Sequence, residues 1–250
     1  MATIPGGAYI SDAHSHDVLH GTADSDHIFA SFAHDDIHAG AGDDYVSVSG
    51  SHTFVDGGTV EDIITVTSEH NLVDGGPGND YIQTSVGHNV VEGGSGNDII
   101  HVNDEQNFVS GGSGDDVIYG GKGGDVLLGD SGNDALHAGS GKELLAGGSG
   151  DDTLYGGPGN DTMLGGSGDN TFVFSSGGGK HVVLDFHDGD ILQIAKNMNG
   201  LNVTSAHDVL DHVTDDHGNA VITLGNETVT LLNVKAEDIH NDPASYFHVH

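Results

Sequence analysis

The 250-residue chain has no cysteine and no tryptophan, and only five of its residues are lysine or arginine. The absence of cysteine excludes disulfides, iron–sulfur clusters, cysteine-ligated zinc and thiol nucleophiles. The shortage of basic residues leaves no positive stripe for phosphates, which excludes nucleic acid as an electrostatic partner. Because no apolar run approaches the roughly 18 residues needed to cross a bilayer, we expect no membrane-spanning segment.

Acidic residues are abundant: 39 Asp and Glu against five basic residues give a net charge of −34. So many negative charges repel one another in a compact chain and destabilise the folded state. Together with a hydrophobic content of only 35%, it is typical of a disordered chain. The Gly and Asp residues recur at fixed positions, however, and this pattern favours an ordered repeat fold.

From Gly21 to Val173 the sequence divides without insertion into 17 blocks of nine residues. The clearest blocks carry Gly at positions one, two and four, Asp at position six and an apolar residue at position eight. Examples are GGSGNDIIH (93–101) and GGSGDDVIY (111–119). In this register the blocks resemble the RTX (repeats-in-toxin, haemolysin-type calcium-binding) family of secreted bacterial proteins.

The block pattern also predicts the core. Six Gly-rich residues make a tight turn, and three residues make a short strand whose middle side chain points inward. Two blocks complete a coil of 18 residues, so residues on one side stack about 4.8 Å apart. Position eight is apolar in every block. The sequence therefore predicts an all-β fold, and the resemblance implies a right-handed parallel β-roll, a β-helix solenoid of 18-residue coils with a small C-terminal capping module.

The turns of the odd-numbered blocks, here called the odd turns, end in a column of Asp residues. Stacked carboxylates about 5 Å apart repel each other unless a cation lies between them. Ca²⁺ takes six to eight oxygen ligands from carboxylates and carbonyls, and the resemblance implies several ions, one between each pair of successive turns. The predicted ligands are Asp44, Asp62, Asp80, Asp98, Asp116, Asp134 and Asp152, with Asp125 and Asp161 on the other side and Gly75, Gly93, Gly111, Gly129 and Gly147 at position one. The alternative is that these blocks are only polar turns.

The turns of the even-numbered blocks, the even turns, lose this pattern in the first half of the chain. Their position six reads Thr53, Asn71, Asn89 and Asn107, which predicts a metal-free side held by an Asn ladder. Their position five forms a histidine row of His34, His52, His70 and His88. A row of imidazoles at coil spacing is a candidate transition-metal site or pH sensor, and the alternative is a set of solvated turn residues.

Position seven of the even blocks points to solvent and yet is apolar over six coils. We name this column the apolar stripe: Phe54, Leu72, Val90, Phe108, Val126 and Leu144. A continuous apolar stripe beside acidic residues is typical of an interaction surface. We expect it to pack against another copy of the chain, unless the C-terminal segment folds back over it.

After Val173 the period stops. We expect strands within 171–194, a helix over 205–213 with Thr204 or Ser205 as its N-cap, and a hairpin of 221–224 and 228–232. The predicted organisation is a lead-in at 1–20, the roll at 21–173 and a cap at 174–250. The resemblance implies that the cap is also the region of a type I secretion signal. The lead-in lacks the charged and apolar segments of a cleaved secretory signal.

No catalytic motif is present: HExxH, GxSxG and the phosphate-binding loop GxxxxGK[ST] are all missing. We therefore predict a protein without enzymatic activity. The predicted function is that of an extracellular or cell-surface structural, adhesive or self-assembling protein whose folding is coupled to Ca²⁺. The alternatives are a module that binds or modifies polysaccharide and a transition-metal binder that uses the histidine row.

Overall fold

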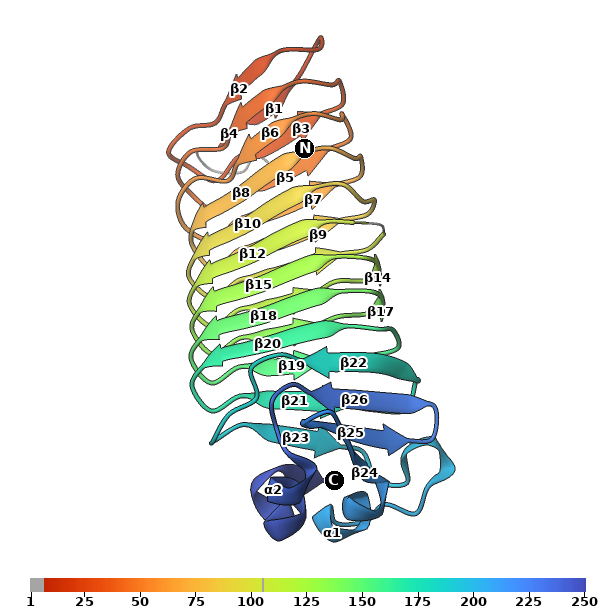
Figure 1. The fold of residues 1–250 in the computed structure, drawn as a ribbon. Coiled ribbons are helices and arrows are strands. Elements are labelled where there is room, and N and C mark those ends of the chain that lie inside the picture. The colour runs from red at the N-terminus through yellow and green to blue at the C-terminus, as the bar shows by residue number, and fades with distance from the viewer. Residues whose placement is uncertain (1–6, 105) are drawn as a thin grey trace.

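The computed structural model describes residues 7–104 and 106–250, which form a long solenoid of two facing parallel sheets (Figure 1). The odd blocks supply sheet A, whose strands are β1 (Tyr9–Ser11), β3 (His27–Ala30), β5 (Tyr45–Val48), β7 (Ile63–Val66), β9 (Tyr81–Thr84), β11 (Ile99–Val102), β13 (Val117–Tyr119), β16 (Ala135–His137), β19 (Thr153–Tyr155), β21 (Thr171–Phe174), β23 (Ile191–Ile194) and β27 (Phe247–Val249). The chain alternates between this sheet and the second sheet, so each pair of strands makes one coil.

The even blocks supply β4 to β20 of sheet B, and the segments before Gly21 and after Val173 supply its other strands. Its strands, in spatial order, are β2 (Val18–His20), β4 (Asp36–His38), β6 (Phe54–Asp56), β8 (Leu72–Pro77), β10 (Val90–Ser95), β12 (Phe108–Ser113), β15 (Val126–Ser131), β18 (Leu144–Ser149), β20 (Thr162–Ser167), β22 (Gly179–Val183), β26 (Glu227–Leu231), β25 (Asn219–Leu224) and β24 (Val213–Asp216). A third, two-stranded sheet pairs β14 (Lys122–Gly123) with β17 (Ser140–Gly141).

The strand register confirms the 18-residue coil. Val46 pairs with Ile64 in sheet A, and Val91 pairs with Val109 in sheet B. Several strands of sheet B are six residues long, because glycines of the turn continue the parallel ladder: Gly76 pairs with Gly94. The predicted three-residue strand is therefore too short on this side.

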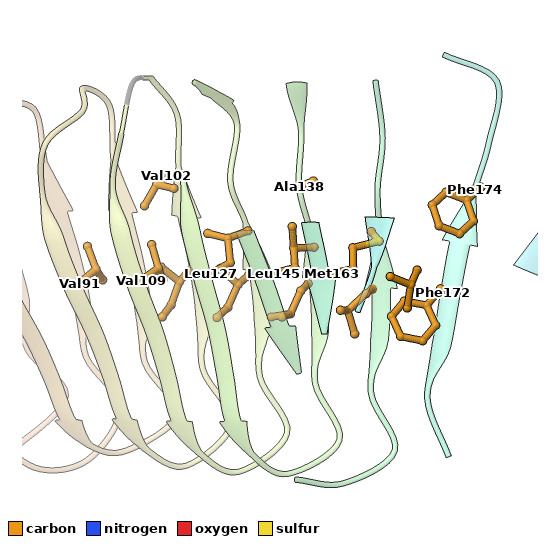
Figure 2. Packing of buried hydrophobic residues seen from close by; sticks show 14 of the residues in the cluster. Val91, Val102, Val109, Leu127, Ala138, Leu145, Met163, Phe172 and Phe174 are labelled. Atoms are coloured by element: carbon orange, nitrogen blue, oxygen red, sulfur yellow. The ribbon is translucent and has the colours of Figure 1, made fainter. Parts of the chain in front are cut away.

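The core confirms the predicted inward position and adds a second one. The side chain at position eight is fully buried in every block. A second buried column stands at position one of the even blocks, because the strands of sheet A often run one residue further than predicted. Figure 2 shows Val102 and Ala138 of this column, and Phe174 that follows the last block, beside the position-eight residues. Two apolar columns instead of one make the core of each coil thicker than the sequence pattern suggested.

The parallel stack also includes residues before Gly21. Ile10 of β1 pairs with Ile28, and Leu19 of β2 pairs with Ile37, both in the 18-residue register. Part of the segment expected as a lead-in therefore forms a coil of its own, although it lacks the glycine pattern.

Beyond Val173 the parallel pairing continues with a changed register. Phe172 pairs with Leu192, and Met163 pairs with Val183, so two residues are added to each coil. The predicted hairpin is confirmed: β25 and β26 pair antiparallel around Gly225 and Asn226.

The C-terminal end carries the helical elements (Figure 1). These are η1 (Met198–Gly200), α1 (Ala206–Val209), η2 (Leu210–His212), α2 (Ala236–Asn241) and η3 (Pro243–Ser245). The predicted N-cap Ser205 is confirmed, since its side chain accepts a hydrogen bond from the Asp208 backbone N–H. The predicted end is wrong by one residue, because Val213 already pairs with Ile222 in β24.

Candidate metal centre

The Asp residues that end the odd turns form a buried column along one edge of the solenoid. Asp80, Asp98 and Asp116 are each at most 2% exposed. The Oδ1 atom of Asp98 accepts the backbone N–H of Asp80 at 2.7 Å, and the Oδ1 atom of Asp116 accepts that of Asp98 at 2.7 Å. The same bond repeats from Asp26 to Asn170. One carboxylate oxygen of each Asp thus holds the neighbouring coil in register.

The second oxygen of these carboxylates is buried without a hydrogen-bond partner. This is true of the Oδ2 atoms of Asp44, Asp62, Asp80, Asp98, Asp116, Asp134 and Asp152. Burial, reinforced by neighbouring Asp residues, raises the pKa of Asp62 to about 8 and the pKa values of Asp80 and Asp116 to about 7. A buried carboxylate is unfavourable unless a cation or a donor compensates it, so these oxygens suit a hard divalent cation such as Ca²⁺.

Glycine at position one makes room for that oxygen. A Cβ atom built on Gly93 would collide with Oδ2 of Asp98, and one on Gly111 would collide with Oδ2 of Asp116. Gly75, Gly129 and Gly147 stand in the same relation to the Asp five residues later. The position-one glycines therefore keep each unpartnered oxygen unobstructed beside the backbone.

From Asn71 to Asn107, the even turns hold their column together with side-chain amides. Oδ1 of Asn89 accepts the Asn71 N–H at 2.9 Å, and Oδ1 of Asn107 accepts the Asn89 N–H at 3.1 Å. The amide Nδ2 of Asn89 donates to the carbonyl of Val86 at 2.8 Å. Asparagine thus supplies a donor where aspartate leaves an unpartnered oxygen, and the predicted Asn ladder is confirmed.

Further along, the even column becomes acidic and ends at a buried histidine. His181 is 1% exposed; its Nδ1 lies 3.0 Å from Asp161 Oδ2 and its Nε2 lies 2.8 Å from Glu227 Oε1. Burial alone would lower the pKa of His181, but the adjacent carboxylates of Asp161 and Glu227 outweigh this effect and raise the pKa to about 9. The imidazolium therefore neutralises Asp161, one of the predicted calcium ligands, from within the chain.

Glu143 and Asp125 occupy the two preceding coils of that column. Burial, together with the neighbouring carboxyls of Asp161 and Asp125, raises the pKa of Glu143 well above its ordinary value. Asp125 accepts hydrogen bonds from Asn107 through Oδ1, while its Oδ2 is buried without a partner, as in the odd turns. Of the two predicted ligands on this side, Asp125 thus has the environment of the odd-turn Asp residues.

A second ladder, which the sequence reasoning missed, runs along position five of the odd turns. Oδ1 of Asn79 accepts the Asn97 N–H at 2.7 Å, and Oδ1 of Asn97 accepts the Asp115 N–H at 2.8 Å. These bonds run in the opposite direction to those of position six. The signal was present in the sequence, because position five reads Asn79, Asn97, Asp115, Asn133, Asp151 and Asp169.

The histidine row is a stack of parallel rings on the surface. Neighbouring centroids lie 5.1 Å apart for His34 and His52, 5.1 Å for His52 and His70, and 5.3 Å for His70 and His88. His16 adds a fifth ring 4.9 Å from His34. Among the residues that the structure describes, no three His, Cys, Asp or Glu side chains converge on a point suited to a metal ion.

The apolar stripe forms one continuous column on the outer face of sheet B. Its members are paired neighbours from Phe54 to Leu144. Leu72 is 46% exposed, Phe108 44% and Val90 43%. The C-terminal segment lies at the end of the solenoid (Figure 1) and leaves these three side chains in solvent.

The repeats identify the family of the chain. The sequence matches the RTX calcium-binding nonapeptide repeat over residues 15–46, 56–90, 65–100, 74–108, 101–136 and 137–172, which together make up more than half of it. The chain therefore belongs to the RTX calcium-binding repeat proteins, as the resemblance implied. Ca²⁺ is the ion that these repeats bind, and RTX repeat proteins are typically secreted by type I systems.

No curated protein matches the chain significantly. Among solved structures, it is similar to the extracellular lipase LipA from Serratia marcescens, with 18% sequence identity and a TM-score of 0.34. The match covers 78% of this chain and 39% of the lipase chain, so this chain spans about two fifths of that protein. Within the described residues, no helix has the length and apolar character needed to cross a membrane.

Proposed function

We propose that this protein is a secreted, calcium-dependent scaffold that self-associates at the cell surface or in the extracellular matrix through the apolar stripe. The exposed stripe is the observation that carries the proposal. An apolar column this long is unusual on the surface of a soluble monomer. Since five strand spacings separate its ends, it runs about 24 Å along the roll.

In this proposal Ca²⁺ ions lie between successive odd turns and are held by the unpartnered Oδ2 atoms and by turn carbonyls. The ligands are the seven odd-turn Asp residues from Asp44 to Asp152 together with Asp125. The support is that each of these carboxylates is buried, lacks a donor for one oxygen and, in the odd turns from Gly75 on, is kept unobstructed by a glycine at position one. Calcium makes the roll rigid, and a rigid roll presents the stripe as a flat surface.

The acidic residues beside the stripe set a condition on its packing against a second copy of the chain. The neighbouring position nine reads Asp56, Asp74 and Glu92, and burial together with the other two carboxylates raises the pKa of Asp74. Two copies packed through the stripe would bring such acidic rims together, so association needs divalent ions or salt to screen them. Self-association and folding would then share one requirement, extracellular calcium.

Sedimentation velocity in saturating Ca²⁺ tests this proposal. Replacing Leu72 and Phe108 with Ser should reduce the oligomer mass while the calcium stoichiometry and the β-sheet spectrum stay unchanged. The matched control replaces Ile63 and Ile99 with Ser; these side chains are 47% and 42% exposed on the outer face of sheet A. The proposal is wrong if the wild-type protein is monomeric at high concentration or if both double variants lose mass equally.

A further inference from the structure

The five histidines His16, His34, His52, His70 and His88 form one regular column on the surface, which is more order than separate solvated turn residues require. Each has a backbone φ between 60° and 69°, in the left-handed region that most residues avoid. Each occupies the same place in its turn, one full coil from the next, so the rings stand in one line. Interplanar angles of 3° to 10° show that the rings are nearly parallel.

Each of these rings keeps its Nε2 nitrogen without a partner in the part of the chain that the structure describes. Nδ1 of His52 lies 3.3 Å from Ser51 Oγ, and Nδ1 of His70 lies 3.9 Å from Glu69 Oε2. Within the described part of the chain, no hydrogen bond or ion pair engages an Nε2 atom of the five rings. All five residues are exposed, so these nitrogens face solvent as a line of imidazole donors.

We propose that neighbouring histidines of this stack bind a divalent transition metal such as Zn²⁺, two imidazoles to each ion. A Zn–N bond is about 2.0–2.1 Å long, so two ligands of one tetrahedral ion lie about 3.4 Å apart. The ring centroids are 4.9–5.3 Å apart and the ring planes are nearly parallel, so both exposed side chains must rotate about χ1 and χ2 to turn one nitrogen each toward a common ion, which needs no movement of the backbone. Water completes the coordination.

The stoichiometry and the selectivity follow from this geometry. Five rings in a line form at most two separate pairs, so the chain takes up to two ions in this stack. Imidazole nitrogen suits Zn²⁺, Cu²⁺ and Ni²⁺, whereas Ca²⁺ prefers oxygen ligands. The stack on the even turns and the carboxylate column on the odd turns therefore select different metals on opposite edges of one roll.

Calorimetric titration of the calcium-saturated protein with Zn²⁺ tests the proposal. The test variant His34→Asn/His70→Asn removes alternate rungs and leaves three histidines two coils, or about 10 Å, apart. The matched control His16→Asn/His88→Asn also removes two histidines but keeps three adjacent ones. Asparagine tolerates the left-handed backbone, which preserves the turns.

The wild-type protein should bind two ions in the stack and the control variant one. The test variant should bind no ion between two histidines, and zinc bound by its single histidines should be held about tenfold or more weakly. X-ray absorption of the zinc-loaded wild type should show two imidazoles per ion. Equal losses in the two variants, or no zinc uptake by the wild type, would overturn the proposal. If the Asn variant misfolds, His34→Gln/His70→Gln replaces it, because Gln106 continues the same column with a positive φ of 31°.

Discussion

Removal of Ca²⁺ should unfold this protein at neutral pH, and the structure gives the size of the effect. Burial raises the pKa values of Asp44, Asp98 and Asp134 from 3.8 to about 6. A shift of about two pH units corresponds to roughly 3 kcal/mol against the folded state with the carboxylate ionised. Three such sites together equal the roughly 5–15 kcal/mol of net stability that a domain possesses, and the net charge of −34 adds to the repulsion.

The assay is far-UV circular dichroism combined with small-angle scattering, at pH 7.5, before and after chelation. Chelation should abolish the β-sheet spectrum and expand the chain towards the radius of gyration of an unfolded 250-residue polypeptide, roughly 55 Å. Adding Ca²⁺ back should restore the roll. Mg²⁺ should not replace it, because Mg²⁺ dehydrates reluctantly and demands octahedral geometry.

The pH dependence of the chelated protein follows from the same groups. Their pKa values are higher in the folded state than in the unfolded state, so the folded state binds protons more tightly. Without Ca²⁺, stability should therefore increase as the pH falls from about 7 towards 4, and the chelated protein should contain more β-structure at pH 5 than at pH 7.5. An unchanged spectrum after chelation at pH 7.5 would refute the reasoning.

Two further predictions separate the roles of the turn residues. Asp98→Ala should lower the calcium stoichiometry measured by calorimetry, whereas Asn89→Ala should leave it unchanged and lower the urea-unfolding free energy by about 1–3 kcal/mol, because the Asn71 N–H loses its acceptor. Loss of calcium in the Asn89 variant would contradict this assignment. Gly94→Ala should destabilise the calcium-loaded roll by more than about 2 kcal/mol, since φ is +115° and the new Cβ would strike the Gly76 carbonyl. Gly218→Ala is its control, with φ +89° and nothing within 4 Å, and should cost only about 1 kcal/mol; equal losses would refute the collision.

Much of this fold could be predicted because a nine-residue period fixes which side chains point inward. Position eight is apolar throughout, and one register satisfies every block at once. The second core column was equally visible, as Val48, Val66 and Val102 at position one of even blocks, but the assumption of three-residue strands left it outside the core. Strand length depends on backbone pairing between coils, which a block pattern does not specify.

The ends of the roll were harder to predict. Ile10 and Leu19 are in phase with the repeat, yet the turns before them lack glycine at positions one and two, so only the pairing of β1 and β2 reveals the coil. At the other end, two added residues place His181 in the column that follows Asp161. Its second partner, Glu227, comes from a distant hairpin, β25–β26, and no local pattern predicts such a contact.

The two columns at position six differ in how many of their buried carboxylate oxygens lack a hydrogen-bond partner and so require a metal ion. At other places in the two columns, the oxygen that lacks a partner in the odd turns is replaced or compensated. An Asn amide replaces it from Asn71 to Asn107, the His181 imidazolium lies beside Asp161 Oδ2, and the His187 backbone N–H donates to Asp190 Oδ2 at 2.9 Å. The unpartnered oxygens that no donor reaches are concentrated on the odd turns. We therefore expect calcium to act mainly on the odd-turn edge of the roll, while hydrogen bonds hold much of the opposite edge, so loss of calcium should open the coils from the odd turns first.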